Sequence, residues 1–213
     1  MIMKILIDDV TAIILAGGES SRMRRNKSLL KLGNETIIEI ISELMTKIFS
    51  KVVISTNEPE RYKFLNSPIV KDIYKNCGPL SGIHAGLSQV ANDRIFVITC
   101  DMPFISQELI THLLNVKSSK QIIIPKADER IQYLCGVYCR SVFPEAERTL
   151  SSLADAVEKN EKIKKTEFSL QNFVKKIGAE MVDVEKESFF FKDLFFNINL
   201  PEDFEYAKIK LEK

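Results

Sequence analysis

The sequence has no excess of charge of either sign and no long apolar run. Its 213 residues carry 30 Lys and Arg against 29 Asp and Glu, a formal net charge of +1. A balanced charge creates no long-range field that would attract nucleic acid or an anionic membrane surface. Apolar runs such as residues 12–16 are far shorter than the roughly 20 residues needed to cross a bilayer. We therefore expect no nucleic-acid partner and no membrane span, and an anion site would have to be local.

Closely spaced cysteines and a convincing export signal are also lacking. The four cysteines are Cys77, Cys100, Cys135 and Cys139. They contain no CxxC pair, so buried thiols are favoured over a metal or disulfide role. Asp8 and Asp9 interrupt the apolar N-terminal segment before it reaches the roughly 7 to 15 residues usual in a signal peptide. These features predict a cytoplasmic protein.

Length and composition are typical of one globular domain. Hydrophobic residues make up 45% of the chain and charged residues 28%, a mixture that argues against a disordered or fibrous protein. The 213 residues amount to about 1.4 average domains. No repeat or low-complexity linker marks a boundary, so we expect residues 1–213 to form a single domain.

Apolar runs and amphipathic segments alternate along the chain. Strands are predicted at residues 12–15, 52–55, 95–99, 121–125 and 134–139. Helices are predicted at residues 37–48, 79–90, 106–116, 145–159 and 201–209. Thr36 and Glu39 have the spacing of a capping box at the start of the first helix. The alternation predicts a Rossmann-like α/β fold, an open and mostly parallel twisted sheet with helices on both faces. Ligands of such sheets bind beyond the carboxyl ends of the strands.

A glycine pair and a basic segment follow the first predicted strand. Gly17 and Gly18 lack a Cβ, so the backbone N–H groups there can approach a polyphosphate closely. The cations between Ser20 and Leu32 are Arg22, Arg24, Arg25, Lys27 and Lys31, with no acid among them. Arg22 can contact two phosphate oxygens and Lys27 can supply a point charge. The segment matches neither the P-loop nor the dinucleotide fingerprint. It is either a different phosphate loop or a flexible basic loop, and its position after the first strand favours the former.

Asp101 follows a buried strand and would lie at the same edge of the sheet as the glycine pair. Its hard oxygens suit Mg²⁺, which takes few protein ligands and binds substrate phosphates for the rest. Alternatively, Asp101 caps the helix after Pro103. Asn199 has two similar interpretations: it completes the metal shell, or it caps the helix that begins at Pro201.

Four further positions are compatible with a nucleotide. Asn57 follows the strand at residues 52–55 and is either a base contact or a turn residue. Asp72 could hold a ribose hydroxyl or lie in the surroundings of the metal. Gly78 and Gly82 would let a flat ligand approach the backbone, although turn and helix packing explain them equally well.

Four motifs in this order together resemble the molybdenum cofactor guanylyltransferases. They are Leu15-Ala16-Gly17-Gly18-x-Ser20-x-Arg22-Met23 with Lys27, Gly78-Pro79-Leu80-x-Gly82-Ile83, Asp101-x-Pro103, and Asn197-x-Asn199-x-Pro201-Glu202-Asp203. The resemblance runs from about Thr11 to Ala207. It implies a similar α/β fold and the transfer of GMP from GTP to the terminal phosphate of molybdenum-bearing molybdopterin, with release of pyrophosphate.

The resemblance also implies roles for individual residues. The nucleotide-binding set is Leu15, Ala16, Gly17, Gly18, Lys27, Asn57, Asp72, Gly78, Pro79, Leu80 and Asp101. Within it Lys27 would bind phosphate, Asn57 and Asp72 would bind guanosine, and Asp101 would bind Mg²⁺. The catalytic residues would be Arg22, Lys27 and Asp101. Asp101 is the metal ligand that the resemblance implies, and Asn199 is the second metal ligand, predicted from its position before the last helix. GTP and molybdopterin are the implied substrates, and proteins that deliver molybdopterin or mature molybdoenzymes are possible partners.

The sequence departs from the family pattern at three positions. Arg24 stands where Gly is usual, Asn26 where Asp is usual, and Leu200 where Thr is usual. Arg24 could change the path or the activity of the loop, and Asn26 could strengthen anion binding or loosen the orientation of Lys27. The rival functions are a cytidylyltransferase, a sugar-phosphate nucleotidyltransferase, and a nucleotide-binding module with little activity. The Gly17-Gly18 pair favours guanylyl over cytidylyl transfer.

Overall fold

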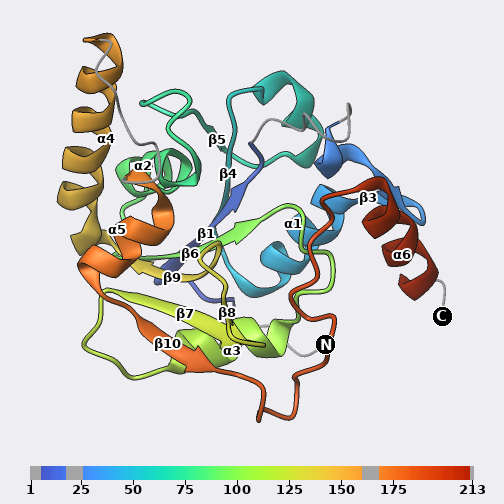
Figure 1. Ribbon diagram of the computed structural model, residues 1–213. Helices are drawn as coiled ribbons and strands as arrows, with labels where there is room; N and C mark the ends of the chain where they lie inside the picture. The colour runs from blue at the N-terminus through green and yellow to red at the C-terminus, as the bar shows by residue number, and fades with distance from the viewer. Residues whose placement is uncertain (1–5, 18–25, 160–167, 212–213) are drawn as a thin grey trace.

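An eight-stranded sheet organises the described part of the chain, residues 6–17, 26–159 and 168–211 of a computed structural model (Figure 1). Its strand order is β10-β7-β9-β6-β1-β4-β5, with β8 paired to β7. The strands are β1 (Val10–Leu15), β4 (Val52–Ser55), β5 (Ile69–Val70), β6 (Arg94–Thr99), β7 (Ile122–Ala127), β8 (Arg130–Ile131), β9 (Cys135–Cys139) and β10 (Glu180–Asp183). A separate hairpin consists of β2 (Lys31–Leu32) and β3 (Glu35–Thr36).

The centre of the sheet is parallel, as the sequence predicts. Strand β1 pairs in parallel with both β4 and β6, and β5 continues this arrangement beside β4. Strand β9 instead runs antiparallel between β6 and β7. Only residues 128–134 separate β7 from β9, and a parallel crossover requires a dozen or more. The fold is therefore a mixed, mostly parallel α/β sheet, with the reversed strand on the side away from β4.

Helices cover both faces of this sheet. They are α1 (Ile37–Ile48), α2 (Pro79–Gln89), α3 (Gln107–Asn115), α4 (Phe143–Glu158), α5 (Leu170–Ile177) and α6 (Pro201–Leu211). The core clusters place α1 and α3 on one face and α2, α4 and α5 on the other. Figure 1 shows α2, α4 and α5 gathered together on one side, with α6 beside β3 at the opposite end. The α6 helix packs through Ala207 against the hairpin and the start of α1.

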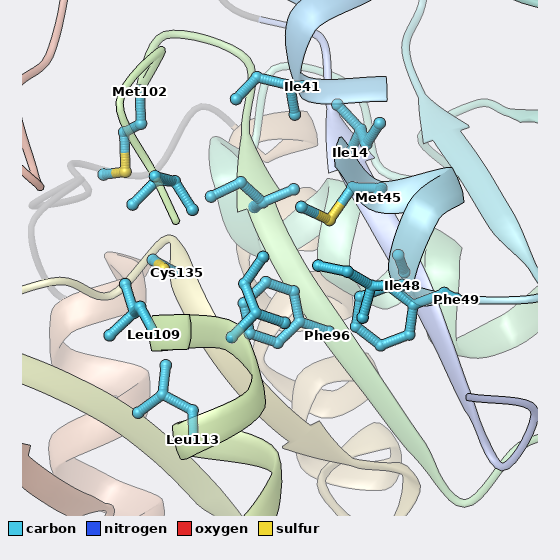
Figure 2. Packing of buried hydrophobic residues seen from close by; sticks show 14 of the residues in the cluster. Ile14, Ile41, Met45, Ile48, Phe49, Phe96, Met102, Leu109, Leu113 and Cys135 are labelled. Atoms are coloured by element: carbon cyan, nitrogen blue, oxygen red, sulfur yellow. The ribbon is translucent and has the colours of Figure 1, made fainter. Parts of the chain in front are cut away.

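Alternating side chains of β1 and β6 divide the core between the two faces. Ile14 and Phe96 point toward α1 and α3, where Figure 2 shows them packed with Met45 and Leu109. The rings of Phe49 and Phe96 stack there at a centroid separation of 5.7 Å. The intervening residues of both strands belong to the opposite cluster, with α2, α4 and α5. The central strands are thus buried on both sides, which explains their continuous apolar sequences.

The predicted starts of α1 and α3 are confirmed by their caps, whereas α4 begins at Phe143, two residues before its predicted start. Thr36 Oγ1 accepts a hydrogen bond from Glu39 N at 3.3 Å, and Glu39 Oε2 accepts one from Thr36 N at 2.7 Å, which completes the capping box. Ser106 caps α3 by accepting a bond from Leu109 N at 3.2 Å. Among the described residues, 3-10 helices also occur as η1 (Lys27–Leu29), η2 (Pro59–Leu65) and η3 (Arg140–Val142).

Helix α5 and strand β10 are elements that the sequence analysis did not predict.

In the described part of the chain no helix combines the length and apolar character of a membrane-spanning segment. All four cysteines are free thiols, but the predicted burial is confirmed only for Cys135, because Cys77, Cys100 and Cys139 are partly exposed.

Candidate functional site

The ends of β1 and β6 bring Gly17 and Asp101 to one edge of the sheet. Ala16 N donates a hydrogen bond to Ser55 O at 2.9 Å, and Cys100 N donates one to Leu15 O at 3.3 Å. The pairing of β1 with β6 therefore continues up to these loops. Leu15 and Ala16 are only 7% and 4% exposed, so they would present their backbone rather than their side chains to a ligand.

Open space lies beside Gly17. A Cβ built there would meet no described atom within 4 Å. Because the φ angle of Gly17 is not in the left-handed region, the conformation itself does not require glycine. Free access to the backbone at the end of β1 is what the glycine provides. Gly18, Arg22 and Arg24 lie outside the described residues.

Asp101 has a buried carboxylate oxygen without a hydrogen-bond partner. This atom, Oδ1, finds no partner among the described residues. Burial raises the pKa of Asp101, while a hydrogen bond from Thr99 and the charge of Lys27 act in the opposite direction. The alternative role as a helix cap is taken by Ser106. An unpaired, hard, buried oxygen is suited to binding a divalent cation.

The composition of the site is compatible with Mg²⁺. Among the described residues, no group of three or more His, Cys, Asp or Glu side chains could hold a metal ion. Mg²⁺ commonly binds through one or two protein oxygens and completes its shell with water and substrate phosphates. Asp101 fits that pattern as a single carboxylate ligand.

Lys27 and Asn199 lie beside Asp101. Lys27 Nζ donates a hydrogen bond to Asn199 Oδ1 at 2.9 Å. Ile198 N donates one to Asp101 O at 3.0 Å, which joins the segment before α6 to the end of β6. Asp203, in the first turn of α6, accepts hydrogen bonds through Oδ2 from the backbone N atoms of Asn199 and Leu200 at 2.8 and 2.7 Å. The Asn199 side chain therefore faces the site, with its oxygen held by Lys27.

Asn57 and Asp72 form a reciprocal pair at the ends of β4 and β5. Asn57 Nδ2 donates to Asp72 Oδ2 at 2.8 Å, and Asp72 N donates to Asn57 Oδ1 at 3.1 Å. Burial raises the pKa of Asp72, and the hydrogen bond from Asn57 opposes that shift. The two predicted guanosine residues are thus brought together, with one fixing the orientation of the other.

The first turn of α2 lies against the same edge. A Cβ on Gly82 would come within 2.9 Å of both Leu15 Cδ2 and Ser55 Oγ, so close helix packing explains this glycine. Gly78 precedes the helix with a φ of 73°, and Pro79 occupies the first turn. Leu80 is fully buried, so its side chain belongs to the core. The helix presents its positive N-terminal end at the edge formed by the ends of β1 and β4.

The loop before α2 is held by side chains that the sequence analysis missed. Tyr74 Oη donates a hydrogen bond to Glu147 of α4, and Ser81 Oγ donates one to Tyr74 O. His84 Nε2 also lies 2.5 Å from Glu147 Oε2. No local pattern in the sequence joins these residues, because Glu147 is 73 positions from Tyr74. Together they anchor the loop that carries Asp72 and Gly78.

Solved structures with this fold define the class of the protein. A molybdopterin-guanine dinucleotide biosynthesis protein A from Archaeoglobus fulgidus superposes with a TM-score of 0.75 at 25% identity, covering 95% of this chain and 98% of that one. A 4-diphosphocytidyl-2C-methyl-D-erythritol synthase from Anaerococcus prevotii shares the fold, with a TM-score of 0.64 at 14% identity over 96% of both chains. The fold is that of the nucleotidyltransferases.

The family follows from the sequence comparisons. Residues 12–164 match the MobA-like NTP transferase domain, and the chain belongs to that family. A relative from Clostridium perfringens (strain 13 / Type A) named "Probable molybdenum cofactor guanylyltransferase" is 39% identical over 196 residues, 92% of this chain and 94% of the relative. A relative of the same name from Pelotomaculum thermopropionicum is 31% identical over 206 residues, 95% of this chain and 93% of the relative.

Proposed function

We propose that the protein transfers GMP from GTP to the terminal phosphate of molybdenum-bearing molybdopterin, forming the guanine dinucleotide cofactor and pyrophosphate. The observation that carries this proposal is the unpartnered Asp101 oxygen, which lies beside Lys27 at the sheet edge where Gly17 leaves open space. The names of the relatives from Clostridium perfringens and Pelotomaculum thermopropionicum support GMP transfer over the rival cytidylyl and sugar-phosphate reactions.

The reaction requires no protein nucleophile. A pterin phosphate oxygen is already ionised near neutral pH and can attack the α-phosphorus of GTP in line with the departing pyrophosphate. The main obstacle is repulsion between two anions, so the protein contributes by positioning them and neutralising charge. Lys27 would bind the phosphates and stabilise the charge that develops on pyrophosphate, and Arg22 would assist it.

Mg²⁺ is the proposed metal, and Asp101 and Asn199 are its proposed ligands. When bound, the ion would neutralise charge on the nucleotide phosphates. Asp101 Oδ1 is available for this purpose. The Asn199 oxygen accepts a hydrogen bond from Lys27, so it would have to exchange that bond for the metal.

The nucleoside would bind along the neighbouring strand ends. Asn57 and Asp72 are proposed to contact guanosine, with Asn57 holding the Asp72 carboxylate in place. The backbone of residues 15–18 and the segment Gly78, Pro79 and Leu80 would line the nucleotide. Residues 1–213 are proposed to act as one nucleotidyltransferase domain, and the cytoplasmic location and the maturation-protein partners stay predictions.

A comparison of nucleotides with molybdopterin as acceptor tests the proposed function. Purified protein would be incubated with Mg²⁺, molybdopterin bearing molybdenum, and GTP, CTP or UTP, and pyrophosphate release would be followed. We expect release with GTP that depends on the pterin. Preference for CTP would support the cytidylyltransferase instead. Preference for UTP with a sugar phosphate as acceptor would support a sugar enzyme, and nucleotide binding without release would support an inactive module.

A further inference from the structure

The side chains of Asn26 and Ser28, the residues on either side of Lys27, form a closed ring of hydrogen bonds with Tyr62. Asn26 Nδ2 donates to Tyr62 Oη at 2.8 Å, and Ser28 Oγ donates to Asn26 Oδ1 at 2.7 Å. Ser28 Oγ and Tyr62 Oη lie 2.9 Å apart. Asn26 Oδ1 also accepts a bond from Ser28 N at 3.1 Å, which makes Asn26 the cap of η1.

The hydrogen-bond directions in the ring follow from the number of donors. The single hydroxyl proton of Ser28 is committed to Asn26, so the Tyr62 hydroxyl must donate to Ser28 Oγ. Each of the three side chains then donates once and accepts within the ring. Ser28 and Tyr62 are each only 1% exposed, so loss of one member would leave a buried polar group without a partner.

The ring connects the Lys27 turn to a separate part of the molecule. Tyr62 belongs to η2, a segment that follows β4. Lys27 is therefore flanked by two residues whose side chains are both hydrogen-bonded to the buried Tyr62 hydroxyl.

We propose that Tyr62 is a positioning residue, which acts through Asn26 and Ser28 to hold Lys27 toward the phosphates of the nucleotide. The inference rests on the phosphate role given to Lys27 in the proposed function. The ring is electrically neutral, so it orients the lysine without placing a compensating negative charge beside it. Tyr62 itself touches no substrate.

The effect of removing the Tyr62 hydroxyl on pyrophosphate affinity tests this inference. Inorganic pyrophosphate is titrated calorimetrically into the wild type, Tyr62→Phe, Lys27→Ala and the double variant. We expect Tyr62→Phe to weaken binding about fivefold, the change expected when a hydrogen bond between neutral groups is lost. In the Lys27→Ala background the same substitution should cause little further loss, because its effect passes through Lys27.

Tyr138→Phe is the matched control. Tyr138 is also fully buried, and its hydroxyl donates to Tyr133 O at 2.5 Å on the far side of the sheet from α1. It should lower the unfolding temperature without changing pyrophosphate affinity. The inference is overturned if Tyr62→Phe binds pyrophosphate as the wild type does, if the two losses add fully, or if the wild type binds no pyrophosphate. Pyrophosphate binding with the expected pattern but no GMP transfer to the pterin would overturn only the proposed function.

Discussion

The charged form of Asp101 is expected to lower the stability of the fold, although the same carboxylate is the proposed ligand of Mg²⁺. Its pKa is raised in the folded protein by burial, so the folded state binds the proton more tightly than the unfolded chain does. The contribution of Asp101 to the stability of the fold is therefore most favourable at low pH, where the carboxyl is protonated. It is lost as pH rises through the pKa of this carboxyl in the folded protein. At neutral pH without a cation, the charged Asp101 is therefore expected to destabilise the fold.

We accordingly predict opposite effects of Asp101→Asn on stability and activity. Without Mg²⁺ and nucleotide at pH 7, the unfolding temperature should rise by about 2–4 °C, and the gain should shrink as pH falls toward 4. Mg²⁺-dependent turnover should fall by about 10²-fold or more. The control is Asp93→Asn, an exposed acid before the opposite end of β6. Full Mg²⁺-dependent turnover in Asp101→Asn would remove the metal assignment.

Lys27 differs from the other described cation of its segment by its contacts. Lys27 reaches Asn199 across the site, whereas Lys31 lies exposed on β2. We predict that Lys27→Ala lowers kcat/KM for GTP about 10²-fold, and that Lys31→Ala changes it less than about twofold, because exposed charges are screened. Steady-state pyrophosphate release measures both. Equal losses would indicate that general positive charge, rather than a placed lysine, is what the loop supplies.

At the scale of elements, the capping box of α1 allows stability to be separated from activity. Thr36→Ala removes the acceptor for Glu39 N and should destabilise the fold by about 1 kcal/mol, with an unchanged KM for GTP. Thermal unfolding and the pyrophosphate assay would be compared with Thr46→Ala. Thr46 lies in the last turns of the same helix, where its hydroxyl bonds only to backbone carbonyls. A comparable loss of stability in Thr46→Ala would contradict the prediction that the capping box stabilises the fold more than another threonine hydroxyl of the same helix does.

The elements that the sequence predicted are those with strong local signals. The strand at residues 52–55 and the helix at residues 37–48 have the predicted bounds, because apolar periodicity and a capping box determine them locally. Helix α5 was missed despite the helical spacing of Leu170, Phe173 and Val174. Strand β10 alternates between half-buried and exposed residues. Its pairing with β7 is a long-range contact that no local pattern reveals.

The candidate site was predictable to a similar extent. The topology of a parallel sheet brings Gly17 and Asp101 to one edge, so their proximity followed from the order of strands and helices. The pairing of Asn57 with Asp72, and the approach of Tyr62 to Asn26, depend on side-chain geometry across separate loops. No local sequence pattern linked Tyr62 to the site, because its partners Asn26 and Ser28 lie more than 30 positions earlier in the chain.

At the scale of the whole molecule, the net charge of +1 means that attraction of the anionic substrates must arise at the sheet edge itself. That edge joins the ends of β1, β4, β5 and β6 with the start of α2 and the segment before α6. These parts are held by backbone hydrogen bonds at the ends of β1 and β6 and by side-chain bonds at Asn57, Asp72 and Lys27. We therefore expect the metal and guanosine positions to be largely in place before nucleotide binds.

A crystal structure of the protein with GTP and Mg²⁺ would test the central claim most directly. We expect the triphosphate beside Gly17 and Lys27, the metal on Asp101, and the guanosine near Asn57 and Asp72. A nucleotide bound in another part of the molecule, with the edge beyond β1 and β6 empty, would contradict the site and the function proposed for it.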